Sequence, residues 1–200
     1  MIMAATGGAR IGPNAVIQVA AALARRLGAG VASDLLRAAG LGAYVRAPPQ
    51  HMIDEREVIA LHTLLRDRLQ PATAGHVMRA AGIATGDYLL KHRIPRFAQA
   101  LLRVLPAALA APLLLGAIRR HAWTFAGSGH FHARSGRPLV ISIEHCPICR
   151  SANAVLPQCG YYAATFRRLF RRLVHRHARV RETACQAAGA DCCRFEIDWG

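Results

Sequence analysis

Thiols and a carboxylate gather near the end of this chain. All six cysteines lie in the last third of the 200 residues, and three of them fall within the stretch ETACQAAGADCCRFEI, from Glu182 to Ile197. Zinc in proteins is held tetrahedrally by thiolate, imidazole and carboxylate ligands. The N-terminal residues lack the basic and then apolar pattern of an export signal, so we expect a reducing cytosol, where disulfides are rare. The clustering therefore favours a local metal site.

One set of candidate ligands can be assembled around a terminal hairpin. It consists of Cys159, Glu182, Cys185 and Cys193. A turn near Gly189 would place Cys185 opposite Cys193, with Glu182 a short step upstream. Cys159 opens a predicted helix, whose N-terminal dipole favours the thiolate form. These residues could supply three thiolates and one carboxylate to a structural zinc.

The spacing leaves other arrangements open. Cys146 and Cys149 form a CxxC pair, which is a common zinc or redox motif and a rival to the first set. Cys192 could replace Cys193 if the hairpin register shifted by one residue. Reduced cysteines that simply fill the core are the third alternative.

The charge of the chain indicates anionic partners. Lys and Arg number 26 against 11 Asp and Glu, a formal net charge of +15, and Lys91 is the one lysine. Such a balance suits acidic lipid, a carboxylated small molecule or nucleic acid. No recognition helix, zinc finger or RNA-binding motif accompanies the arginines, so we expect no specific nucleic-acid partner. The helix predicted from Cys159 to His175 has four arginines on one face, and we expect that face to remain on the surface and to help docking on acidic membrane lipid or a pathway enzyme: Arg167, Arg168, Arg171 and Arg172.

The elements that must position these residues fall into two parts. Apolar periodicity predicts a helix within 12–37 capped by Asn14, a second helix capped by Asp54, a third over about 73–91, and one or two more up to 121 that break at Pro106 and Pro112. The most apolar run, 104–118, is too short to span a bilayer. Short runs with Trp123, Phe125 and Phe131 between glycines then predict antiparallel strands, followed by one helix and the hairpin.

We therefore predict a single α/β domain of the α+β type over 1–200. It would have a mainly helical half over 12–120 and an α/β half over 121–200 that carries the zinc site, with a small antiparallel sheet packed by helices. The paired glycines at Gly28 and Gly127 do not lie between a buried parallel strand and a helix, so they do not indicate a dinucleotide site.

The cysteine pattern resembles a known domain. Cys-Gly-Tyr before a helix, followed by Glu-x-x-Cys-x7-Cys-x-Phe, is similar to the 4-vinyl reductase domain, which is also the sensor domain of phenol-responsive bacterial activators. The resemblance implies a zinc held by Cys159, Glu182, Cys185 and Cys193. It favours Cys193 over Cys192, and it leaves Cys146 and Cys149 outside the set.

The resemblance extends over nearly the whole chain. The segments MIDEREVIALHTLLR, GDYLLKHRIP, LLRVLPAALAAPLLLGAI and HAWTFAGSG are similar to the bacteriochlorophyll 4-vinyl reductase family of phototrophic proteobacteria. The family name implies reduction of the 8-vinyl group (4-vinyl in the older numbering) of divinyl protochlorophyllide or chlorophyllide. The resemblance also implies an α/β fold around an apolar ligand pocket, often as a homodimer.

Vinyl reduction needs a hydride and a proton, normally from NADPH or a reduced flavin. The sequence shows no motif for either cofactor, and a zinc with four protein ligands is a closed, structural site. We therefore rank an accessory or carrier protein for a Mg-tetrapyrrole above the 8-vinyl reductase itself, and a small-molecule-sensing regulator after both. We expect a cytoplasmic protein, peripheral on the photosynthetic membrane at most.

A Mg-tetrapyrrole offers a large apolar face, a magnesium that accepts one axial imidazole, and carboxylates that suit arginine. His121 and His62 are the candidate axial ligands, and Trp123 and Phe125 could line the pocket. Arg119 and Arg120 could meet a propionate group.

Overall fold

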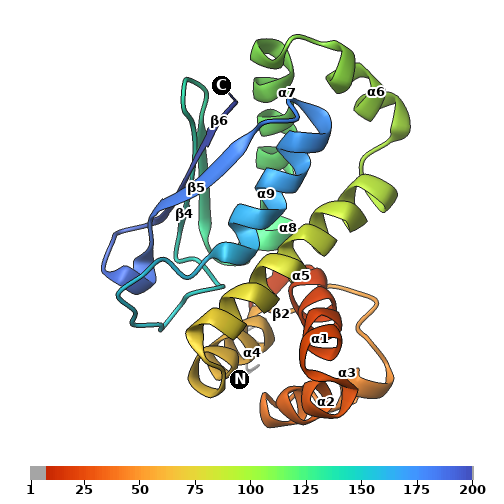
Figure 1. Cartoon of the computed structure of the whole chain (residues 1–200), viewed down its shortest axis with the longest axis vertical. Helices are drawn as coiled ribbons and strands as arrows, with labels where there is room; N and C mark the ends of the chain where they lie inside the picture. The colour runs from red at the N-terminus through yellow and green to blue at the C-terminus, as the bar shows by residue number, and fades with distance from the viewer. Residues whose placement is uncertain (1–7, 200) are drawn as a thin grey trace, which may run out of the picture.

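The computed structural model describes residues 8–199, which form helices around a four-stranded sheet (Figure 1). The helices are α1 (Asn14–Leu27), α2 (Ala29–Ala38), α3 (Ala43–Arg46), α4 (Glu55–Arg68), α5 (Pro71–His92), α6 (Arg96–Val104), α7 (Ala107–Arg120), α8 (Trp123–Ala126), α9 (Gly160–Leu173) and the 3-10 helix η1 (Gln186–Ala188). The strands are β1 (Arg10–Ile11), β2 (Ile53–Asp54), β3 (His130–Arg134), β4 (Leu139–Glu144), β5 (Arg179–Ala184) and β6 (Cys193–Asp198). The predicted combination of helices with a small antiparallel sheet is confirmed.

The first helical segment differs from the prediction of one helix within 12–37. The chain breaks at Gly28, whose φ of +93° favours glycine, and α1 and α2 lie on either side of it. Pro13, not Asn14, occupies the cap position of α1. The cap of α4 is as predicted, because the Asp54 side chain accepts the Arg56 backbone N–H at 2.9 Å.

The apolar segment after α5 forms α6 and α7. The chain turns at Pro106 as predicted, but Pro112 lies inside α7 and does not end it. Pro112 removes one backbone hydrogen bond from the helix, and its exposed position lets water satisfy the carbonyl group that is left free. Across residues 8–199, no helix is both long and apolar enough to cross a lipid bilayer.

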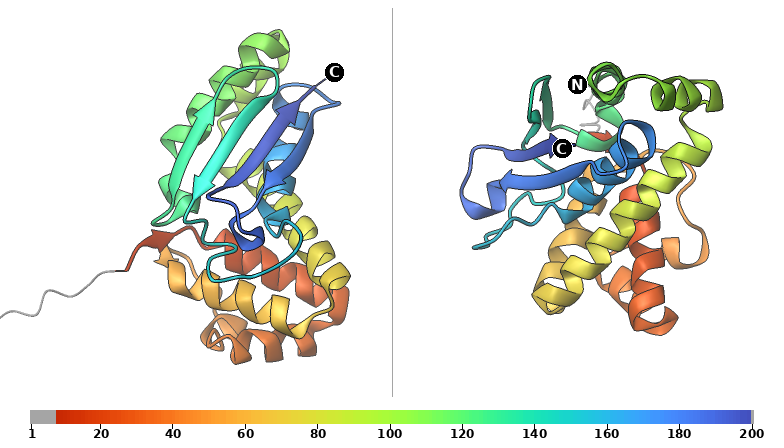
Figure 2. Two further views of the ribbon diagram at one scale, coloured as in Figure 1. Left: turned by 90° about the vertical axis from the view of Figure 1, so that its left-hand side faces the viewer. Right: turned by 45° about the horizontal axis from the view of Figure 1, so that its top comes forward.

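The four-stranded sheet is antiparallel throughout, in the order β3-β4-β6-β5. Figure 2 shows α7 and α9 on one face of the sheet and the other face uncovered. Trp123 and Phe125, predicted in strands, lie instead in α8, because the Ala126 N–H bonds the Ala122 carbonyl and closes a helical turn before Gly127. Phe131 lies in β3 as predicted.

Helices α5 and α9 pack on each other at unusually close range. A Cβ atom added at Gly82 would overlap the Tyr161 carbonyl oxygen, and one added at Gly86 would lie 2.7 Å from Arg168 Cβ. The Thr165 hydroxyl donates to the Gly82 carbonyl at 3.0 Å across this contact. The pair therefore fixes the position of α9, whose first residue follows Cys159 directly.

Candidate metal centre and ligand surface

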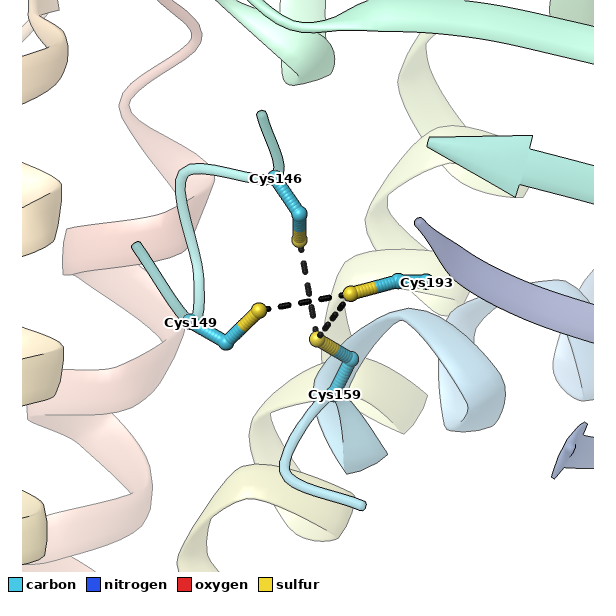
Figure 3. A group of neighbouring side chains, drawn as sticks. All are labelled: Cys146, Cys149, Cys159 and Cys193. Atoms are coloured by element: carbon cyan, nitrogen blue, oxygen red, sulfur yellow. Dashed lines mark hydrogen bonds between the residues drawn. The ribbon is translucent and has the colours of Figure 1, made fainter. Parts of the chain in front are cut away.

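Five cysteine side chains converge where α9 begins beside the sheet. The Sγ atoms of Cys146 and Cys159 are 3.5 Å apart, and those of Cys149 and Cys193 are 3.3 Å apart. Cys193 Sγ also lies 3.5 Å from that of Cys159 and 3.9 Å from that of Cys185. All five side chains are buried, and none is in a disulfide. Figure 3 shows four of the sulfurs pointing toward one centre.

Separate segments deliver these sulfurs. Cys159 precedes α9, Cys185 lies between β5 and η1, and Cys193 opens β6. In the β5–β6 hairpin Ala184, not Cys185, is paired with Arg194, so Cys185 comes just after the ladder and not directly opposite Cys193 as predicted. Cys146 and Cys149 lie in the loop after β4, where the Cys146 N–H bonds the Gln186 side-chain oxygen at 2.7 Å.

The donor atoms form two groups of four, and within each group they all lie within 4.8 Å of one another. One group is the predicted set of Cys159, Glu182, Cys185 and Cys193. The other joins the rival pair to two members of the first, as Cys146, Cys149, Cys159 and Cys193. Cys193 belongs to both groups, and Cys192 belongs to neither.

Glu182 shows how the site fits a cation. Its Oε2 accepts the Cys159 backbone N–H at 2.9 Å, while its buried Oε1 has no hydrogen-bond partner within residues 8–199. Burial, and then the proximity of Cys185, raise the pKa of Glu182 to about 9. A divalent ion would give the orphaned oxygen a partner and favour the carboxylate. Sulfur with one oxygen is also a donor set that zinc accepts.

A polar network missed by the sequence reasoning anchors the CxxC loop to α4. Buried Glu55 accepts hydrogen bonds from the Ser128 backbone N–H at 2.8 Å, the Ser128 hydroxyl at 2.7 Å and the Arg150 guanidinium at 2.7 Å. Burial opposes ionisation of Glu55, but the bonds from Ser128 and Arg150 outweigh it, so its pKa is lowered. Part-buried Arg66 of α4 donates to the Ile148 carbonyl at 2.7 Å. No local spacing could have indicated these pairs, because Glu55 and Arg150 are 95 residues apart.

Three of the predicted ligand-binding residues lie together on the surface. His121, Arg119 and Arg120 line a shallow, open depression of about 670 Å³ at the C-terminal end of α7, with Leu113, Gly116 and Ala117. His121 Nδ1 lies 2.9 Å from the Ala117 carbonyl oxygen. A carbonyl can only accept, so Nδ1 carries the hydrogen and Nε2 of the neutral ring keeps its lone pair.

The remaining predicted residues lie in different surroundings. His62 is buried in the interior beside the Tyr161 ring, and burial lowers its pKa to about 4. Phe125 packs edge-on against Phe131 and is half-buried, whereas Trp123 is 62% exposed. The structure thus brings His121 and the two arginines together, and it separates them from His62.

Exposed apolar side chains follow the same part of the chain. They lie on α6 and α7 at helical spacing, as Phe97, Leu101, Val104, Leu109 and Leu113. Between Asp87 and Glu144 the sequence has no acidic residue and eight Lys and Arg residues. The four α9 arginines are exposed or half-exposed as predicted, but Arg168 pairs with Asp87 at 2.7 Å and Arg171 donates to the Ala178 carbonyl.

The chain is similar to proteins of bacteriochlorophyll synthesis. Residues 139–198 match the vinyl-4-reductase domain family. The bacteriochlorophyll synthase 23 kDa chain of Cereibacter sphaeroides is 48% identical, over 94% of this chain and 90% of the relative. The protein of the same name from Rhodobacter capsulatus is 42% identical, over 94% and 86%. Among solved structures, an H-NOX protein from S. oneidensis in the Fe(II)NO ligation state shares the fold, with a TM-score of 0.56 at 11% identity, over 95% of this chain and 99% of that one.

Proposed function

Because the chain belongs to the family of the bacteriochlorophyll synthase 23 kDa chains, we propose that it binds a Mg-tetrapyrrole intermediate of bacteriochlorophyll synthesis, such as divinyl protochlorophyllide, as an accessory or carrier protein. The same relatives support a pathway enzyme as its partner. A structural zinc held by Cys159, Glu182, Cys185 and Cys193 is part of the proposal, supported by the convergence of those donors and by the orphaned Glu182 oxygen.

The observation that carries the ligand proposal is the depression at the end of α7. It presents His121 Nε2 as a free lone pair, which suits the axial position of magnesium. Arg119 and Arg120 border the same depression and suit a propionate carboxylate, and Leu113 supplies apolar contact for the ring. An open surface of this kind would hold a large ring with one face exposed, which is what a carrier needs in order to pass it on.

The apolar stripes of α6 and α7 support docking on an anionic membrane. Leu113 belongs both to the α7 stripe and to the depression, so the stripe leads into the proposed ligand site. An apolar surface flanked only by cations binds the interface of acidic bilayers. Docking there would let the apolar ring move between bilayer and protein without crossing water.

Spectroscopic titration tests the ligand proposal. Purified protein is titrated with monovinyl and divinyl protochlorophyllide, and the Soret and Q bands are followed. We expect binding that His121→Ala weakens at least tenfold and that free imidazole partly restores, because the lost ligand is an imidazole. The control is His76→Ala, which removes an exposed histidine on α5.

Two results would contradict the proposal. If neither pigment binds, the chain is not a tetrapyrrole carrier. If NADPH or reduced flavin, added at the end, gives a product heavier by two hydrogens in mass spectrometry, the chain is the 8-vinyl reductase itself.

Flotation with anionic vesicles tests the docking surface. We expect the double variant Phe97→Ser and Leu101→Ser to lose most of its vesicle binding, because it removes two exposed apolar contacts from α6. The comparison is Arg167→Gln with Arg172→Gln, which removes two cations from α9. If the α9 variant loses binding and the α6 variant keeps it, docking occurs on the basic face of α9.

A further inference from the structure

We propose that the five converging cysteines and Glu182 form a centre for two zinc ions, in which Cys159 and Cys193 each bridge both ions. The inference rests on the single structural zinc proposed above and adds a second metal position to it. The terminal ligands are Cys146 and Cys149 for one ion, and Glu182 and Cys185 for the other.

The first argument is the way in which the two donor groups overlap. Each group holds four donors, and the two groups share Cys159 and Cys193, whose sulfurs are 3.5 Å apart. Six side chains therefore give each of two ions a complete set of four protein ligands, provided that the shared thiolates bridge. The measured sulfur separations, 3.3 to 3.9 Å, are close to the edge of a ZnS4 tetrahedron, about 3.8 Å for a Zn–S bond of about 2.3 Å.

The second argument is what a single ion would leave behind. An ion in the predicted set leaves Cys146 and Cys149 as buried thiols, each within 3.5 Å of a ligand sulfur. An ion in the all-cysteine set leaves Glu182 with a buried oxygen that lacks a hydrogen-bond partner in the described part of the chain. Two ions use every one of these donors.

The third argument is charge. Five thiolates and one carboxylate carry six negative charges, of which two divalent ions compensate four. The protein supplies further positive potential at both ends of the centre. Arg66 lies against the loop between Cys146 and Cys149 through its bond to the Ile148 carbonyl, and the Gln158 backbone N–H lies 3.4 Å from Cys185 Sγ. The N-terminal end of α9 meets the centre at Cys159.

Metal stoichiometry is the primary test. Protein produced with added zinc and purified without chelator is analysed for metal and for acid-labile sulfide. We expect two zinc ions per chain in the wild type and in the control Cys192→Ser, which removes the one cysteine outside both groups. Cys146→Ser with Cys149→Ser should retain one ion, and so should Glu182→Gln with Cys185→Ser. Cys193→Ser removes a bridge and should lower the content below one.

The other outcomes overturn the inference in ways that separate it from the single-zinc proposal. One ion per chain that Cys146→Ser with Cys149→Ser leaves in place means that the predicted set binds alone. One ion that this variant loses means that the all-cysteine set binds alone. No metal in the wild type refutes both proposals, and iron with labile sulfide replaces zinc by an iron–sulfur cluster.

A spectroscopic test on the wild type avoids variants that fail to fold. After exchange with 113Cd, we expect two NMR resonances of equal intensity, split by coupling through the shared sulfurs. X-ray absorption of the zinc protein should show a metal–metal distance of about 3 Å, which follows from a 3.5 Å sulfur separation and Zn–S bonds of about 2.3 Å. A single cadmium resonance and no metal–metal scattering would refute the two-ion centre.

Discussion

Replacing Glu55 by Gln should destabilise the protein by loosening the loop that carries Cys146 and Cys149. The Glu55 carboxylate is buried and accepts three hydrogen bonds, two from Ser128 and one from the Arg150 guanidinium. A glutamine side chain keeps one acceptor oxygen, and its NH2 group cannot accept from Arg150. The variant therefore loses the charge-assisted bond between α4 and the loop, while the shape of the side chain is almost unchanged.

The expected loss is about 2–3 kcal/mol. A hydrogen bond to a charged group contributes about 1.5–3 kcal/mol, and breaking a fully buried ion pair costs about 3–5 kcal/mol. The Arg150 side chain is 28% exposed, so water partly replaces the lost partner and the lower range applies. For a urea dependence of about 2.5 kcal/mol/M, the unfolding midpoint should fall by about 1 M.

Urea unfolding followed by circular dichroism at pH 7 provides the measurement. The matched control is Asp34→Asn, which makes the same acid-to-amide change in a carboxylate–arginine pair with Arg37 that is exposed on both sides. That variant should lose less than about 1 kcal/mol, because exposed ion pairs contribute little. Equal midpoints for the two variants would refute the anchoring role of Glu55.

The difference between wild type and Glu55→Gln should also depend on pH. The folded-state pKa of Glu55 lies below its ordinary value of 4.5, so the carboxylate contributes stability that is present above that value and is lost as the pH falls through the folded pKa. The two midpoints should therefore approach each other in acid. A difference that stays constant below the folded pKa would contradict this reasoning.

Two further predictions concern packing and metal. Gly82→Ala should destabilise by more than about 3 kcal/mol or prevent folding because its Cβ overlaps the Tyr161 backbone, whereas Gly116→Ala, at an exposed helical position where an added Cβ has no neighbour within 4 Å, should stabilise by about 0.5–1 kcal/mol; thermal unfolding compares them, and similar shifts would contradict the close α5–α9 contact. A strong chelator should lower the melting temperature and added zinc should restore it, because metal binding contributes to folding; an unchanged melting temperature would contradict a structural metal.

Features fixed by neighbouring residues could be predicted from the sequence. The start of α4 at Asp54 and the turn at Pro106 depend on local hydrogen bonding and backbone geometry. The grouping of Glu182, Cys185 and Cys193 follows in the same way from one hairpin.

Features fixed by distant contacts could not be predicted. Cys146 and Cys149 approach Cys159 and Cys193 in a loop that Arg66 and Glu55 of α4 hold from outside. Trp123 lies in a helical turn although its neighbours have the composition of a strand, because Gly127 allows the chain to reverse only afterwards. Spacing in the sequence carries no signal for such long-range contacts.

The close contact of α5 and α9 at Gly82 and Gly86 determines which motions the protein can make. Shear between packed helices requires side chains that exchange contacts as the helices slide, and backbone packed on backbone leaves no room for that exchange. Displacement of α6 and α7 relative to the cysteine cluster is therefore confined to hinges at the proline-containing connections, residues 93–95 and 105–106. The ligand surface can swing about these hinges while the cluster and the helix pair move as one rigid body.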